Sequence, residues 1–258
     1  MKKIILLAIV MALCFSLAGC SDGGSGGGET ADNGVVKVYN WGEYIDEEVI
    51  EMFEEETGIE VIYDTFETNE EMYPIIEAGG VAYDVVCPSD YMIEKMIANN
   101  LLQEINFDNI PNIEYISDSI MEGSKAFDPE NKYSVPYTFG TLGILYNTEL
   151  VDDPVDSWSI LWDEKYAGEI IMYNSVRDLF VAPLELLGYS INTTDDQELE
   201  EAKNLLLEQK PLLQRYVMDQ IKDIMISESA ALAMCYSGEV LQLQESNENL
   251  AYAVPKEG

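Results

Sequence analysis

The sequence predicts an α/β protein made of two successive units joined by a hinge. From residue 35 to about residue 140, short apolar segments with the alternation of strands are followed by segments with helical periodicity, and the same alternation resumes further along the chain. Between these stretches, residues 133–141 are extended and interrupted by proline and glycine. We therefore expect a hinge at residues 139–143, a first unit over residues 35–140 and a second unit over residues 141–254.

The first unit reads as strands that alternate with helices. The expected strands cover residues 36–41, 59–63 and 83–88, and the expected helices open after Asp46, Thr68 and Ser89. Asp46 can cap the first helix, which carries Val49 and Phe53 on one apolar face and can end at Gly58. Thr68 and Glu71 fit a capping box for the second helix. Beyond these elements, residues 107–132 are rich in turn formers and only weakly periodic.

The second unit repeats this pattern. The expected strands cover residues 142–146, 168–172 and 231–236, and the expected helices cover residues 157–162 and 174–187 and open again at residues 194–197. The last of these helices carries Leu199, Ala202 and Leu206 on one face, which is the spacing of a core-facing helix.

The first candidate ligand site lies where the strand at 36–41 ends. In α/β folds the ligand crevice lies at the carboxyl ends of the strands, and Trp41, Glu43 and Tyr44 occupy such a strand-to-helix connection. Aromatic faces attract ammonium groups and a carboxylate neutralises them, so these residues could form a box for an organic cation. The alternative is that Trp41 and Tyr44 are core aromatics beside a solvated Glu43.

Two further connections carry side chains suited to a ligand. Ser89-Asp90-Tyr91 follows the strand at 83–88 and could face the same crevice as Trp41 in a parallel sheet. Tyr236-Ser237-Gly238-Glu239 follows the buried-type strand at 231–236 and is the third candidate connection.

The beginning of the chain has the organisation of an export signal. A basic pair at Lys2 and Lys3 precedes an apolar region at 4–17, and Leu17-Ala18-Gly19-Cys20 closes a signal over residues 1–19. That tetrapeptide resembles the lipobox of bacterial lipoproteins, which implies a lipid on Cys20, a flexible tether over residues 20–34 and a domain on the outer face of the cytoplasmic membrane. The alternative is an uncleaved anchor helix with an incidental cysteine, although a spanning helix needs roughly 20 apolar residues.

The charge of the chain narrows the class of ligand. Asp and Glu number 49 against 13 Lys and Arg, which gives a formal net charge of −36. Such an excess of acid argues against nucleic acid or anionic lipid as the ligand and is compatible with a cation. Many of these carboxylates fall in runs such as Glu54-Glu55-Glu56, for which a solvated helix face is the ordinary interpretation.

The absence of histidine restricts the catalytic and metal-binding chemistry that the chain can perform. Without histidine the chain cannot form Ser-His or Cys-His pairs or the usual zinc ligand sets, so we expect no metal and no cofactor. Cys14 belongs to the signal and Cys20 is the proposed lipid site. Cys87 and Cys235 are far apart in the sequence, and we expect two separate buried thiols rather than a disulfide.

A series of short motifs runs through the chain in a fixed order. They are YNWGEY at 39–44, FEEETGIEVIY at 53–63, NEEMY at 69–73, YDVV at 83–86 with PS at 88–89, YSVPY at 133–137, LGYS at 187–190 with NTTD at 192–195, and PKEG at 255–258. Together they resemble the bacterial spermidine/putrescine-binding proteins, the extracytoplasmic solute receptors of polyamine ABC transporters. The resemblance implies two α/β lobes of the periplasmic-binding-protein type, a ligand cleft between them, capture of a polyamine without catalysis, and delivery to a membrane permease.

The resemblance also assigns roles in the first lobe. Trp41 and Tyr44 match the family's aromatic wall, and Ser89 and Tyr91 match polar contacts at the second connection. Without the resemblance, Ser89 could equally be the cap of the helix that it precedes.

In the second lobe the match is less complete. Asp178 matches one of two carboxylates that meet an ammonium group in the family, whereas the other carboxylate falls on Ser175, which is not acidic. Tyr236 stands where the family often has tryptophan and still offers an aromatic face. Stabilisation of the helix dipole is the alternative role for Asp178.

The end of the chain departs from the family pattern. Relatives continue past the PKEG motif into a Trp-x-Asp motif that binds a central amine, and then through helices that complete both lobes. We therefore expect this sequence to be a fragment or a truncated form, in which residues 255–258 begin the return crossover to the first lobe. We also expect exposed apolar surface and weaker binding than in a complete site.

Other functions fit parts of the sequence. A receptor of the same architecture could bind another small solute, such as an amino acid or a metal complex, because few crevice residues set specificity. A secreted glycoside hydrolase that uses two carboxylates needs no histidine and is the less favoured alternative. No oligomerisation signal stands out, so we expect a monomer, and the sequence does not indicate whether spermidine or putrescine is preferred.

Overall fold

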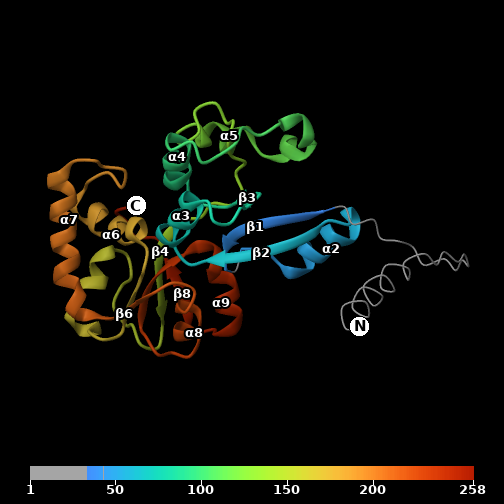
Figure 1. Ribbon diagram of the computed structural model, residues 1–258. Coiled ribbons are helices and arrows are strands. Elements are labelled where there is room, and N and C mark those ends of the chain that lie inside the picture. Colours follow the sequence, from blue (N-terminus) through green and yellow to red (C-terminus); the bar gives the residue numbers. More distant parts are fainter. Residues whose placement is uncertain (1–33, 43) are drawn as a thin grey trace, which may run out of the picture.

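The computed structural model describes residues 34–42 and 44–258 and has the expected two-lobed α/β fold (Figure 1). A three-stranded sheet is built from residues between 35 and 86, and a five-stranded sheet is built from residues between 142 and 253. The two sheets therefore use separate parts of the chain, and each has its own buried core. The exact boundaries of the lobes remain a prediction.

The first lobe contains a parallel sheet with the order β2-β1-β3. Its elements are β1 (Val35–Trp41), α2 (Glu47–Thr57), β2 (Glu60–Phe66), α3 (Asn69–Ala78), β3 (Val85–Val86) and α4 (Asp90–Ala98), followed by the 3₁₀ turns η1 (Phe107–Asn109) and η2 (Pro111–Tyr115) and by α5 (Asp118–Ser124). Helix α5, in the turn-rich region, is an element that the sequence pattern did not indicate. The predicted strand at 83–88 is shorter than expected, since only two of its residues pair with β1.

The predicted helix ends of the first lobe are confirmed. Asp46 accepts a hydrogen bond from the backbone N–H of Glu48, and Thr68 accepts one from the N–H of Glu71. Gly58 has φ 69°, in the left-handed region where glycine carries no steric penalty, and it ends α2 as expected.

The core of the first lobe lies on one side of its sheet. Tyr39, Phe66, Met72, Tyr73, Met92 and Met96 are buried, and they place α3 and α4 against the sheet. No residue of α2 is buried, and Met52 is 66% exposed. The apolar face predicted for α2 therefore does not cover a core among the described residues, and the first lobe exposes apolar surface.

The second lobe contains a mixed sheet with the order β6-β5-β7-β4-β8. Its elements are β4 (Leu142–Asn147), η3 (Trp158–Trp162), η4 (Glu164–Tyr166), β5 (Ile170–Tyr173), α6 (Val176–Leu187), α7 (Asp196–Gln209), η5 (Lys210–Leu212), β6 (Leu213–Val217), α8 (Ile221–Ile226), β7 (Leu232–Tyr236), η6 (Ser237–Glu239), α9 (Val240–Ser246) and β8 (Leu250–Ala253). Strand β5 is parallel to β6 and β7, whereas β4 is antiparallel to β7 and β8. The sequence pattern missed β6, α8, α9 and β8, and the helix expected at 157–162 is a 3₁₀ helix.

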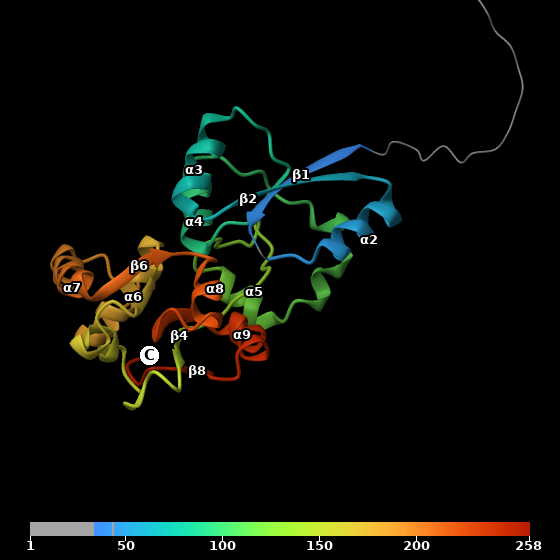
Figure 2. The ribbon, with the colours of Figure 1, turned by 90° about the horizontal axis from the view of Figure 1, so that it is seen from below.

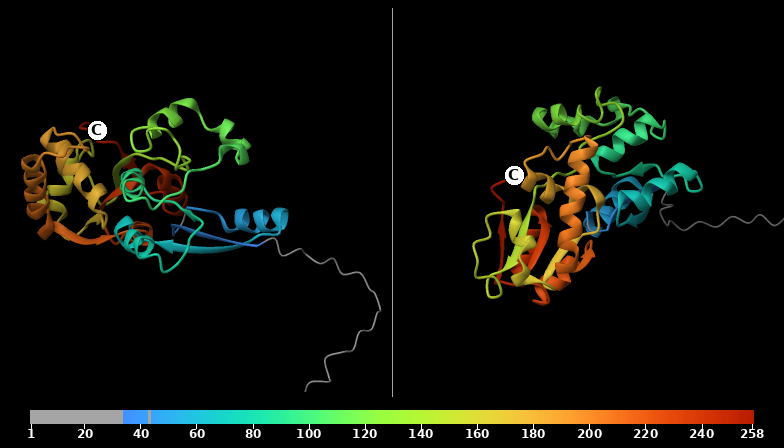
Figure 3. Two further views of the ribbon diagram at one scale, coloured as in Figure 1. Left: turned by 45° about the horizontal axis from the view of Figure 1, so that its top comes forward. Right: turned by 90° about the vertical axis from the view of Figure 1, so that its left-hand side faces the viewer.

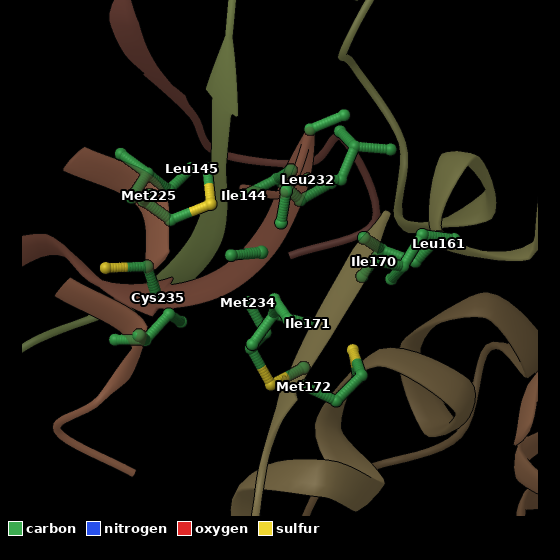
Figure 4. Close-up of a cluster of buried hydrophobic side chains, with 14 of the residues drawn as sticks. Ile144, Leu145, Leu161, Ile170, Ile171, Met172, Met225, Leu232, Met234 and Cys235 are labelled. Carbon is green, nitrogen blue, oxygen red and sulfur yellow. The ribbon is translucent and has the colours of Figure 1, made fainter. Parts of the chain in front are cut away.

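Helices cover both faces of this second sheet, with α6 and α7 on one side and α8 and α9 on the other (Figures 1 and 3). Between them, the side chains of β4, β5 and β7 form a fully buried apolar cluster that includes Ile144, Ile171 and Met234 (Figure 4). Burial on both faces explains why these strands read as short apolar runs in the sequence. The loops at the ends of these strands are therefore placed by a tightly packed core.

A single extended segment leads from the first lobe into β4 (Figure 2). Within the predicted hinge at 139–143, Leu142 and Gly143 pair with Tyr236 and Cys235 in the second sheet. A side chain at position 143 would overlap the hydroxyl of Tyr252. Movement between the lobes therefore remains a proposal for residues 139–141 only.

Several predictions concern residues outside the described part of the chain. The signal over 1–19, the lipid site at Cys20, most of the tether over 20–34 and Glu43 lie there. Within the described ranges no helix has the length and apolar character to cross a membrane. Cys87 and Cys235 are unbridged, as expected, although Cys87 is only half-buried.

Candidate functional site

Trp41 stands where β1 ends and packs between the core of the first lobe and Tyr44. Its ring lies 4.6 Å from the ring of Phe66, which is buried, and 5.9 Å from the ring of Tyr44. Tyr44 is 36% exposed, and its backbone carbonyl accepts a hydrogen bond from the hydroxyl of Tyr137. The core interpretation thus holds for the side of Trp41 that contacts Phe66, whereas Tyr44 is only partly covered.

The second connection is organised around Asn69, a residue that the sequence pattern missed. Asn69 is only 3% exposed, and its Nδ2 donates to the hydroxyl of Ser89 at 3.0 Å and to that of Tyr91 at 2.9 Å. The backbone N–H of Ser89 donates to Asn69 Oδ1 at 3.2 Å, and Tyr91 donates to Glu70 Oε1 at 3.0 Å. Ser89 precedes α4 without a capping hydrogen bond from its side chain. The structure therefore does not support the capping role for Ser89.

Asp178, in the first turn of α6, is the half-buried carboxylate of the site. Burial raises its pKa, because loss of water disfavours the charged form. Hydrogen bonds with the side chains of Ser175 and Tyr236 oppose that rise, and the negative charges of Glu70 and Asp90 add to it. Glu70 and Asp90 belong to the first lobe, so Asp178 faces that lobe across the cleft.

Two tyrosines from different lobes meet beside Asp178. Burial raises the pKa of Tyr44 to about 12, and the charges of Glu239, Asp178 and Asp219 contribute to the rise. The pKa of Tyr236 is also raised, first by burial and then by Asp178, with a smaller effect of Tyr44. Such effects fall off with distance, so Tyr44 lies close to carboxylates of the second lobe.

The predicted ligand-binding residues are therefore brought to one place. They are Trp41, Tyr44, Ser89 and Tyr91 from the first lobe, and Ser175, Asp178 and Tyr236 from the second. The two groups belong to different lobes. The negative charge of Asp178 in the second lobe raises the pKa of Tyr44 and of Tyr91 in the first lobe, so these residues lie near one another. Their role in holding a ligand remains a proposal.

Tyr236 is held by a chain of contacts with Tyr173, Glu239 and Lys222. The backbone N–H of Tyr236 donates to the hydroxyl of Tyr173 at 3.2 Å, and that hydroxyl lies 3.5 Å from Glu239 Oε2. Glu239 in turn forms an ion pair with Lys222 at 3.8 Å, and both side chains are mostly buried. Sequence reasoning missed Tyr173 and Lys222, because nothing in their local sequence shows that they lie behind Tyr236.

A hollow opens beside this site between the lobes. It has a volume of about 610 Å³ and is lined by Tyr39, Gly42, Thr65, Phe66, Glu67, Glu71, Ile75 and Asp219. Asp219, in the β6–α8 connection, comes so close to Gly42 that a Cβ atom there would lie 2.8 Å from Asp219 Oδ2. Gly42 and Asp219 thus mark a close approach between the lobes, and Asp219 is a further residue that the sequence pattern missed.

The chemistry of the site suits an organic cation. The charge of Asp178 raises the pKa of Tyr44 in the first lobe and of Tyr236 in the second, and further carboxylates are present at Glu70, Asp90 and Asp219. Rings attract ammonium groups through their faces, and a partly desolvated carboxylate pairs with them strongly. Within the described ranges, no group of three or more His, Cys, Asp or Glu residues could hold a metal ion.

Comparison with known proteins agrees with this geometry. The family model described as bacterial extracellular solute-binding protein matches residues 48–258. The spermidine/putrescine-binding periplasmic protein of Escherichia coli (strain K12) is 35% identical over 229 residues, which cover 88% of this chain. The match covers 65% of that relative, so the chain spans slightly less than two thirds of its length.

Solved structures show the same similarity. The substrate-binding protein PotD of a spermidine/putrescine ABC transporter from Streptococcus pneumoniae is 43% identical with a TM-score of 0.69, over 86% of this chain and 68% of that one. The TpPotD lipoprotein of Treponema pallidum is 30% identical with a TM-score of 0.79, over 86% and 70% of the two chains.

Proposed function

The chain belongs to the family of bacterial extracellular solute-binding proteins, and from this we propose that it binds a protonated polyamine of the spermidine and putrescine class between its two lobes. Binding would be followed by delivery to the permease of an ABC transporter, with the lobes closing about residues 139–141. The protein would act by capture and release, without catalysis.

One observation carries this proposal. Asp178 is a half-buried carboxylate that hydrogen-bonds with Tyr236 on its own lobe and faces the rings of Tyr44 and Tyr91 on the other. An ammonium group placed there would gain a charged hydrogen bond, worth about 1.5–3 kcal/mol. Each contact with an aromatic face adds about 0.5–2 kcal/mol. Methylene groups of the ligand would pack against the same rings.

The proposed location follows from the start of the sequence. The lipobox-like residues 17–20 support a lipid on Cys20, which would hold the domain at the outer face of the cytoplasmic membrane. The lipoprotein of Treponema pallidum named above is a relative of this kind. The acidic surface supports a cationic ligand rather than nucleic acid or anionic lipid.

The test is isothermal titration of the purified protein with putrescine and with spermidine. We expect binding of at least one of the amines, and we expect Asp178→Asn to weaken it about tenfold or more, since a charged hydrogen bond of about 1.5–3 kcal/mol becomes a neutral one. Asp118→Asn is the matched control, because Asp118 is also an aspartate in the first turn of a helix but is exposed on α5.

The titrations of the two variants distinguish results that support the proposal from results that overturn it. Binding that is weakened by Asp178→Asn and kept within about twofold by Asp118→Asn supports the proposal. A folded protein that binds neither amine, or an Asp178→Asn variant that binds as the unaltered protein does, would overturn it.

A further inference from the structure

We propose that the first lobe unfolds on its own while the second lobe stays folded, and that ligand binding joins the two lobes into one cooperative unit. The separate unfolding follows from the packing of the two lobes. Its link to the ligand rests on the proposed function.

The two lobes have separate cores of very different size. Residues 35–141 and 142–258 are segments of similar length, so folding restricts a similar number of backbone bonds in each. Burial of apolar surface is the main force that offsets this loss of entropy. The second lobe buries a long series of apolar side chains from β4, β5, β7 and the segments that cover them. Among the described residues, the buried core of the first lobe consists of Tyr39, Phe66, Met72, Tyr73, Met92 and Met96.

The first lobe also leaves apolar surface uncovered. Helix α2 has no buried residue, and its Val49 and Met52 are 52% and 66% exposed. Val35 on β1 and Val85 on β3 are 47% and 50% exposed. In the second lobe, helices cover both faces of the sheet (Figures 1 and 3). Side chains that stay exposed after folding add little to stability, so the first lobe has the smaller excess of burial over entropy.

The backbones of the two lobes are joined through one segment. Their sheets are separate, and within residues 34–42 and 44–258 no backbone–backbone hydrogen bond joins residues 35–140 to residues 142–258. The extended segment before β4 leads from one lobe into the other (Figure 2). Regions of a protein that share few interactions can open separately, and each then has its own free energy of opening. Loss of the first core would therefore leave the second sheet intact.

The candidate ligand site spans both units. Trp41 and Tyr44 belong to the first lobe, and Asp178 and Tyr236 belong to the second. A ligand that contacts both groups binds only molecules whose first lobe is folded, so it stabilises that lobe by mass action. Binding therefore raises the fraction of molecules in which the first lobe is ordered.

Hydrogen exchange followed by mass spectrometry over a series of urea concentrations tests the separate unfolding. The method reports on peptides from each lobe of the full-length protein, without any substitution. We expect peptides from β1 and β2 to lose protection at a urea concentration at least about 1 M lower than peptides from β5 and β7.

Two matched variants test whether the transitions are independent. Met96 on α4 and Met225 on α8 are both fully buried methionines, one in each core. We expect Met96→Ala to lower the midpoint of the first lobe by about 1–2 M urea and to leave the second lobe unchanged, because the cavity affects one core only. Met225→Ala should lower the midpoint of the second lobe only. A single cooperative unit would instead lose stability in both lobes equally with either variant.

The same exchange series with putrescine or spermidine tests the link to the ligand. At an amine concentration about a hundred times the dissociation constant, we expect the midpoint of the first lobe to rise by about 1 M urea, toward that of the second.

Each result supports or overturns one part of the proposal. Two transitions, of which Met96→Ala moves only the first, support separate unfolding, as does a Met96→Ala variant that has lost all protection in the first lobe and none in the second. One common transition, earlier loss of the second lobe, or an equal fall of both midpoints in Met96→Ala overturns it. If an amine binds in isothermal titration and the midpoint of the first lobe does not rise, the link to the ligand is wrong. If neither amine binds and the transitions stay separate, the proposed function is wrong and the separate unfolding stands.

Discussion

The hydroxyl of Tyr173 accepts a hydrogen bond from the backbone N–H of Tyr236 at 3.2 Å, and the centroids of their rings lie 5.0 Å apart. Tyr173 ends β5 and is 2% exposed, whereas Tyr236 ends the neighbouring β7 and borders the cleft. A buried ring with a satisfied hydroxyl therefore fixes the position of a ring that we propose to contact the ligand.

Replacement of Tyr173 by phenylalanine tests this support. The change keeps the ring but leaves the N–H of Tyr236 without its partner, so we expect the free energy of unfolding to fall by about 1–2 kcal/mol. We also expect polyamine affinity to fall several-fold, because Tyr236 loses its fixed position. Urea unfolding and isothermal titration measure the two effects. Tyr146→Phe on β4 is the control, and equal behaviour of the two variants would contradict the prediction.

Local signals explain which parts of the fold could be predicted. Asp46, Thr68 and Gly58 mark helix ends by interactions within a few residues, so the sequence shows them directly. Strands buried on both faces, such as Leu232–Tyr236, stand out as apolar runs. Strand Leu213–Val217 contains Gln214 and Arg215 and therefore lacks the apolar run of a buried strand. The helix that follows it, Ile221–Ile226, is too short to show a helical periodicity.

The candidate site was predictable in part for the same reason. Trp41 and Tyr236 end strands, and Tyr91 lies in the first turn of the helix after β3, which are positions that sequence can locate. Asn69 and Asp219 act through contacts with segments far away in the chain, and no spacing rule reveals such contacts. Sequence therefore located the candidate site residues at the ends of strands, whereas the residues that contact them from distant segments had no local signal.

The approach of Gly42 to Asp219 leads to a second prediction. A Cβ atom on residue 42 would lie 2.8 Å from Asp219 Oδ2, so Gly42→Ala must displace that carboxylate or separate the lobes. We expect polyamine affinity to fall several-fold. Gly80→Ala is the control, because a Cβ atom there has no neighbour within 4 Å among the described residues.

A double-mutant cycle checks the cause of that effect. If the carboxylate is what obstructs the new methyl group, Gly42→Ala should cost less in an Asp219→Ala background than in the unaltered protein. Additive losses in titration would show that the two residues do not interact and would contradict the structural explanation.

Gly143 offers a prediction about stability. It lies in β4, and a Cβ atom there would overlap the hydroxyl of Tyr252 and come 2.6 Å from the carbonyl oxygen of Ala253 on β8. We expect Gly143→Ala to lower the free energy of unfolding by about 1–3 kcal/mol, as overpacking does elsewhere. Gly140→Ala, whose Cβ would meet only Ser237 Oγ at 3.6 Å, should unfold nearly as the unaltered protein does in urea.

Acidification provides a test of Asp178 itself. Burial raises the pKa of this carboxyl above its ordinary value of 3.8, so in the folded protein it takes up a proton at a higher pH than an exposed aspartate would. The ammonium groups of a polyamine stay charged throughout this range. Protonation of Asp178 therefore removes one partner of the proposed ion pair and leaves the other unchanged.

We expect polyamine affinity to be full at neutral pH and to fall as the pH is lowered through the raised pKa of Asp178, with a midpoint above 3.8. The stability effect has the opposite sign: a raised carboxyl pKa means that the folded state binds the proton more tightly, so this group's contribution to stability falls as the pH rises from 3.8 through the raised value. Titrations at a series of pH values measure the first effect and urea unfolding the second. Asp178→Asn should lose the part of each dependence that comes from residue 178, and an unaltered protein whose affinity stayed constant down to pH 3.8 would show that Asp178 does not pair with the ligand.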